Sequence, residues 1–125
     1  MFSHIVLGAD DIAAAQKFYD AILGALGYAP AQATPDGSRF MYVGENGVLI
    51  ITKPRNGEPA TYANGGTVGF SAATPELVDA FYAAGLANGG TDEGAPGPRE
   101  VMPGSYGAYL RDPTGNKLVA WCAGA

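Results

Sequence analysis

The side chain best suited to acid–base or metal chemistry is His4, the single histidine in the 125-residue chain. Imidazole changes its charge near neutral pH and is the commonest metal ligand in proteins. The chain has one cysteine, Cys122, so Cys/His-rich metal sites and intrachain disulfides are excluded. Three roles are open for His4: a cavity residue that binds a ligand or transfers a proton, a metal ligand, or a hydrogen-bonded structural residue. Cys122 is expected to be a small buried apolar residue.

Aromatic and cationic side chains form a second group of candidates. Tyr42 and Tyr109 occupy corresponding strands and could stack on a flat ligand, or they could serve only in sheet packing. A carboxylate or a phosphate could be held by Arg39, Lys53 and Arg99, with solvated surface charge as the alternative. Trp121 is expected in a cavity wall or an interface.

These side chains must be positioned by short strands and two amphipathic helices. Asp10 or Asp11 can cap the first helix, whose apolar residues recur at three- and four-residue steps. Thr74 followed by Pro75 marks the start of the second helix. Residues 95–103 are rich in Pro and Gly, so we expect a loop there. Strands are expected over residues 2–7, 39–43, 48–53, 67–72, 106–111 and 117–122.

The chain looks like two copies of a strand–helix–strand–strand–strand unit. A shift of 63 residues places His4 over Thr67 and the Phe-Tyr pair of the first helix over that of the second. The copies span about residues 1–57 and 64–125. A unit of about 60 residues buries too little surface to be stable alone. We therefore expect a single domain over residues 1–125, made of two packed modules.

Alternation along the strands assigns their side chains to two faces. An apolar face, expected beneath the helices, carries Ile5, Leu7, Ile50, Val68, Phe70 and Leu118. The opposite face mixes polar and apolar side chains, as a ligand cavity does. It carries His4, Val6, Leu49, Ile51, Lys53, Thr67, Gly69, Ser71, Lys117, Val119 and Trp121.

Composition excludes several classes of partner. Hydrophobic residues make up 47% of the chain and charged residues 15%, which suits one globular domain. The net charge is −5 and there is no cluster of Lys and Arg, so no nucleic-acid partner is expected. No apolar run approaches the roughly 18 residues that span a bilayer, so no membrane partner is expected. The N-terminus lacks a signal-peptide pattern, and a cytoplasmic protein is expected.

Three motifs resemble those of the vicinal oxygen chelate superfamily, which includes glyoxalase I, bleomycin resistance proteins and extradiol dioxygenases. They are His4 in an opening strand, Asp-Ile-Ala…Phe-Tyr over 11–19 with Leu-Gly-x-Leu-Gly-Tyr over 23–28, and Leu-Arg-Asp-Pro-Thr-Gly-Asn over 110–116. The resemblance implies an α+β fold. Two βαβββ modules would form a curved mixed sheet around a cleft, with the helices on the outside. It also implies a homodimer.

Members of that superfamily often hold a divalent metal through four residues in the first and fourth strands of the two modules. The matching positions here are His4, Ile51, Thr67 and Val119. One imidazole cannot hold a metal selectively, so no cofactor is expected and His4 is the one surviving candidate metal ligand.

We therefore predict a small-molecule-binding protein without the usual metal centre. The alternative is a glyoxalase- or dioxygenase-type enzyme, a lyase or isomerase, that uses His4 with an atypical metal or acid–base site. His4 is the candidate catalytic residue. The predicted ligand-binding residues are Tyr42, Ile51, Lys53, Thr67, Arg99, Tyr109, Val119 and Trp121.

Overall fold

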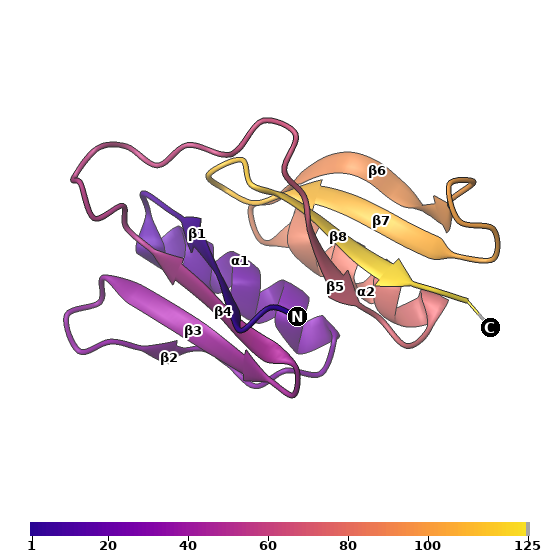
Figure 1. The fold of residues 1–125 in the computed structure, drawn as a ribbon, viewed down its shortest axis with the longest axis horizontal. Coiled ribbons are helices and arrows are strands. Elements are labelled where there is room, and N and C mark those ends of the chain that lie inside the picture. The colour runs from indigo at the N-terminus through magenta and orange to yellow at the C-terminus, as the bar shows by residue number, and fades with distance from the viewer. Residues whose placement is uncertain (125) are drawn as a thin grey trace.

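The computed structural model describes residues 1–124 and has the predicted α+β architecture, with two helices and eight strands (Figure 1). The first half contains β1 (His4–Gly8), α1 (Ile12–Ala25), β2 (Gln32–Ala33), β3 (Arg39–Gly44) and β4 (Gly47–Thr52). The second half contains β5 (Val68–Ser71), α2 (Pro75–Ala87), β6 (Thr91–Pro98), β7 (Tyr106–Arg111) and β8 (Lys117–Cys122). The two halves have the same kind of order, as two βαβββ modules predict.

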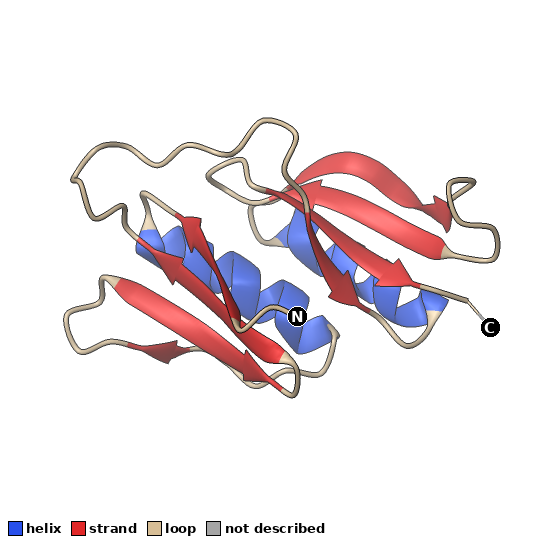
Figure 2. Cartoon of the chain, in the orientation of Figure 1, coloured by secondary structure: helices blue, strands red, loops and turns tan. Residues whose placement is uncertain are grey.

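The strands form two four-stranded mixed sheets, ordered β1-β4-β3-β2 and β5-β8-β7-β6. The pairs β1–β4 and β5–β8 are parallel and the other pairs are antiparallel. Figure 2 shows the sheets side by side in one layer, with both helices behind them. We call the uncovered side of each sheet its open face. β1 and β5 are the inner edge strands, and we call the line between them the seam.

Local signals set the helix ends where the sequence predicts them. The Asp11 carboxylate accepts a hydrogen bond from the Ala14 amide at 3.0 Å, which makes Asp11 the cap of α1. Thr74 caps α2 in the same way, by accepting from the Leu77 amide at 3.3 Å. No helix within residues 1–124 is long and apolar enough to cross a membrane.

The register of β4 corrects one predicted face. Leu49 lies opposite Ile5, and Ile51 lies opposite Leu7, so all four side chains point toward the helices. Ile51 is completely buried in the core, and Ile50 is the residue on the open face. The prediction that Leu49 and Ile51 face away from the helices was therefore wrong. Because β4 is apolar at every position from Val48 to Ile51, alternation alone could not assign its faces.

In the second sheet the predicted faces are confirmed. Val68 pairs with Leu118 and Phe70 with Ala120, and these side chains lie beneath the helices. The predicted loop at 95–103 was wrong in its first part, because β6 continues to Pro98 and pairs with β7. The pairing shifts register twice along this Gly- and Pro-rich strand. An edge strand tolerates proline, since one side of it makes no ladder hydrogen bonds.

A buried polar cluster ties the two halves together. The Tyr19 hydroxyl, on α1, donates a hydrogen bond to Asp112 Oδ2 at 2.5 Å. Asp112 begins the turn between β7 and β8, and its Oδ1 accepts from the amides of three residues in that turn. Asn116 Nδ2 donates to Asp112 Oδ2 at 2.8 Å and to the Gly8 carbonyl at 3.1 Å. The closing motif is thus a structural clamp between the halves.

Candidate functional site

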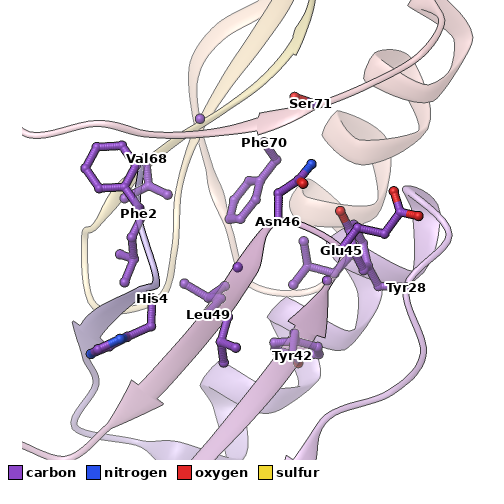
Figure 3. A pocket seen from close by; sticks show the side chains of 16 residues that line it. Phe2, His4, Tyr28, Tyr42, Glu45, Asn46, Leu49, Val68, Phe70 and Ser71 are labelled. Atoms are coloured by element: carbon purple, nitrogen blue, oxygen red, sulfur yellow. The ribbon is translucent and has the colours of Figure 1, made fainter.

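A cavity of about 440 Å³ lies at the seam, between β1 and β5 (Figure 3). We call it the seam cavity. Its volume falls within the roughly 300–1,000 Å³ of typical small-molecule sites. The residues labelled in Figure 3 are Phe2, His4, Tyr28, Tyr42, Glu45, Asn46, Leu49, Val68, Phe70 and Ser71.

The walls of the seam cavity are mostly apolar and aromatic. Val68 and Phe70 project from β5, and they are only half-buried because no further strand pairs with this edge of the second sheet. Leu49 contributes from the first sheet. Phe2 lies in the segment before β1 and is 69% exposed, so its ring forms a wall without being part of the core. These surfaces suit an apolar or aromatic ligand.

A few polar side chains lie around this apolar space. Glu45 and Asn46 form the turn after β3, and Figure 3 shows them on the same side of the seam cavity as Tyr28. His4 lines the other side, at the start of β1. The Ser3 hydroxyl and His4 Nδ1 lie 2.8 Å apart, which is hydrogen-bonding distance. Figure 3 shows the His4 ring directed away from Leu49 and Phe70, so a ligand here would meet mainly one carboxylate and one carboxamide.

Tyr42 lines the seam cavity, but its hydroxyl is already engaged. The hydroxyl donates to Asp20 Oδ1 at 2.6 Å, and this carboxylate oxygen of Asp20 also accepts from the Ala31 amide at 3.0 Å. Burial, together with the hydrogen bond to Asp20, holds the pKa of Tyr42 far above its usual range. Tyr42 therefore stays neutral at physiological pH and offers a ligand its ring.

Four of the predicted ligand-binding residues gather elsewhere, on the open face of the second sheet. Val119 lies opposite Tyr109 and beside Gly69, and Trp121 is the next open-face residue along β8. The guanidinium carbon of Arg99 is 5.2 Å from the centre of the Tyr109 ring. These side chains form a group separate from the seam cavity.

The remaining predicted residues join neither group. Ile51 lies in the core under the helices. Lys53 and Thr67 are exposed, at the two ends of the linker between the halves. Sequence reasoning missed Phe2, Tyr28, Glu45 and Phe70 as cavity residues. The Asn-Gly turn signal locates Glu45 in a hairpin, but no pattern in the sequence places that hairpin at the seam.

The residues at the superfamily's metal positions do not fit a metal centre. The 63-residue shift places Val6 over Gly69. Ile50 pairs with Val6 and Val119 pairs with Gly69, so Ile50 rather than Ile51 is the counterpart of Val119. Neither Ile50 nor Val119 has a donor atom. Within residues 1–124, no three His, Cys, Asp or Glu side chains lie close enough together to hold a metal ion. One imidazole is well short of the three protein ligands of a catalytic zinc site.

Known proteins match this fold and sequence. The model of the Glyoxalase/Bleomycin resistance protein/Dioxygenase superfamily matches residues 1–120. A crystal structure of a glyoxalase/bleomycin resistance protein from Albidiferax ferrireducens T118 is 50% identical in sequence, with a TM-score of 0.91. That match covers 97% of this chain and 98% of the other. No curated protein matches the chain.

Two more distant structures are also similar. A lactoylglutathione lyase from Agrobacterium tumefaciens is 26% identical, with a TM-score of 0.66, over 97% of this chain and 92% of the other. A glyoxalase-related enzyme from Fulvimarina pelagi is 19% identical, with a TM-score of 0.79, over 98% and 87%, and supports the fold alone. The family model and the 50% identical structure lead to one conclusion: the chain belongs to the glyoxalase/bleomycin resistance protein/dioxygenase superfamily.

Proposed function

We propose that this protein binds a small apolar or aromatic molecule in the seam cavity and does so without a metal centre. The observation that carries the proposal is the cavity itself: about 440 Å³, with aromatic walls and a few polar groups. Such a mixture buries the body of a ligand and fixes its orientation. The residues at the superfamily's metal positions offer few donor atoms, which supports binding without a metal. These residues are His4, Ile50, Thr67 and Val119.

The test uses neutral aromatic probes, indole and 1-naphthol, in a titration followed by amide chemical shifts. Shifts should concentrate at Ile5 and at residues 68–71, which border the seam cavity. Phe2→Ala should weaken binding about two- to tenfold, because one aromatic contact contributes about 0.5–1.5 kcal/mol. Its exposure leaves the folding free energy almost unchanged.

Val101→Ala is the matched control, since Val101 is 85% exposed and does not line the seam cavity. It should leave probe binding unaltered. Saturable shifts that map to the open faces instead, or equal losses in Phe2→Ala and Val101→Ala, would contradict the proposed site. Binding of one zinc or nickel ion per chain that His4→Ala abolishes would contradict the metal-free part.

A second candidate function rests on the short distance between Ser3 and His4. A histidine acting as general base needs a partner that orients its ring, and the Ser3 hydroxyl is 2.8 Å from Nδ1. The corresponding activity would be that of a glyoxalase- or dioxygenase-type enzyme, as the name of the Agrobacterium lyase suggests. Turnover of methylglyoxal–thiol adducts or catechols that is lost in His4→Gln would favour this function over simple binding.

We also propose that the protein forms a homodimer. Val6 and Val43 lie on the open face of the first sheet and are 51% and 62% exposed. Burying such apolar side chains between two copies would be favourable. Light scattering should give twice the chain mass, and Val6→Lys should give a monomer while Val101→Lys does not. A wild-type monomer at about 100 μM would refute the dimer, since standard interfaces bind more tightly than this.

A further inference from the structure

A tyrosine flanked by two cations lies on the open face of the second sheet. The Arg99 guanidinium carbon and Lys117 Nζ are each 5.2 Å from the centre of the Tyr109 ring. We call Arg99, Tyr109 and Lys117 the cationic cluster. None of the three lines the seam cavity. Both distances are within the roughly 6 Å at which a cation is attracted to an aromatic face.

Neutral groups hold Arg99 in place. Its Nη2 donates hydrogen bonds to the carbonyls of Ala95 at 2.5 Å and Gly107 at 2.8 Å, and its Nε donates to Gly107 at 3.2 Å. Carbonyl oxygens orient a guanidinium but do not cancel its charge. The side chain is therefore fixed over Tyr109 at little further cost in conformational entropy when a ligand binds.

The positive charge of this region is only partly compensated. Arg111 lies directly opposite Lys117 in the β7–β8 pair, and like charges in that arrangement repel. Glu93 forms an ion pair with Arg111 at 2.7 Å. Within residues 1–124, neither Arg99 nor Lys117 has a carboxylate within ion-pair distance. Two cations thus lie against the same tyrosine ring without a carboxylate partner, in a chain whose net charge is −5.

Apolar side chains continue the same surface. Val119 pairs directly with Tyr109, and Trp121 follows it on the open face of β8. A ligand with an anionic head and an apolar body could contact the cationic cluster with its head and Val119 and Trp121 with its body. Arg and Lys both bind carboxylates and phosphates, the former through a planar fork of donors.

We propose that the cationic cluster binds the oxyanion of a small organic acid, a carboxylate or a phosphate ester, with its apolar body against Val119 and Trp121. This second site goes beyond the proposed function and does not depend on the seam cavity. The oxyanion would supply the negative charge that both Arg99 and Lys117 lack.

Trp121 makes the test direct, because it is the single tryptophan of the chain. The probes are cyclohexanecarboxylate, cyclohexyl phosphate, inorganic phosphate and the neutral cyclohexylmethanol, none of which absorbs where tryptophan does. Tryptophan fluorescence and titration calorimetry should both saturate with the first or second probe. Raising salt from about 0.05 M to about 0.5 M should weaken that binding, because added ions screen exposed charges. Comparison of cyclohexanecarboxylate with cyclohexyl phosphate separates a carboxylate site from a phosphate site.

Lys117→Gln should weaken binding about tenfold or more, as expected when a hydrogen bond between charged groups is lost. Lys53→Gln is the matched control: it removes the same charge from an exposed lysine in the other half and should have no effect. Phe2→Ala should also have no effect, which separates this site from the seam cavity. The proposal is overturned if neither method detects saturable binding, if the neutral alcohol binds equally well, or if both lysine variants weaken binding equally.

Discussion

Replacing Tyr19 by phenylalanine tests whether the clamp between the two halves stabilises the fold. Tyr19 is completely buried, and its hydroxyl donates to the buried carboxylate of Asp112 at 2.5 Å. Tyr19→Phe removes this hydroxyl and keeps the ring, so packing of α1 is unchanged. The remaining four hydrogen bonds to Asp112 come from its own turn and stay in place.

The magnitude follows from the type of bond that is lost. A hydrogen bond to a charged group contributes about 1.5–3 kcal/mol, and no cavity is added to that cost. We expect the free energy of unfolding to fall by about 2 kcal/mol. For a domain of this length, that loss lowers Tm by about 8 °C.

Urea denaturation followed by circular dichroism measures the change, with an unchanged m value showing that the unfolded state is the same. Tyr82→Phe is the matched control, because Tyr82 occupies the corresponding place in α2 and donates to Asp92 at 2.9 Å in an exposed setting. It should cost less than about 0.5 kcal/mol. Equal losses in Tyr19→Phe and Tyr82→Phe, or no measurable loss in Tyr19→Phe, would refute the clamp.

Four further predictions concern stability. Gly85→Ala should destabilise the fold by about 1–3 kcal/mol in urea denaturation, because the added Cβ would overlap a leucine side chain of β7. Gly24→Ala, where nothing lies within 4 Å, should stabilise it by about 0.5–1 kcal/mol. Burial and a neighbouring carboxylate raise the pKa of both Tyr19 and Tyr42 above that of an unfolded tyrosine. The stabilisation that comes from these raised pKa values is complete below about pH 10 and is lost as the pH rises further. The urea midpoint should therefore fall between about pH 9 and 11, and it should fall less in Tyr19→Phe. Thr74→Ala should cost about 0.5–2 kcal/mol, with lower helicity in circular dichroism, through loss of the α2 cap.

The features predicted correctly from the sequence depend on neighbours along the chain. Asp11 and Thr74 cap their helices through amides three residues ahead. The bounds of β7 and β8 are those predicted, since turn residues stand at both ends of each strand. The closing motif around Asp112 is one of the three motifs whose resemblance predicted the α+β fold and the superfamily.

The errors arose where distant partners decide the structure. β6 contains three glycines or prolines in its last four residues, and only pairing with β7 makes it a strand. Whether Ile51 faces the helices depends on the register of β4 with β1, because a shift of one residue would move every side chain to the other face. Since Val48 to Ile51 are all apolar, either face would suit them. Alternation could not supply that register.

For the candidate site, the sequence by itself singled out His4 and the shortage of metal ligands, and it predicted Arg99, Tyr109 and Trp121 as binding residues. Only the tertiary structure separated these residues into two regions. The seam cavity exists because two edge strands from different halves face each other, which brings Phe2 near Phe70. Likewise, Arg99 reaches Tyr109 because backbone carbonyls of β6 and β7 hold its guanidinium. Residue types and short spacings determine which chemistry is available, whereas pairing across the whole chain determines which side chains meet.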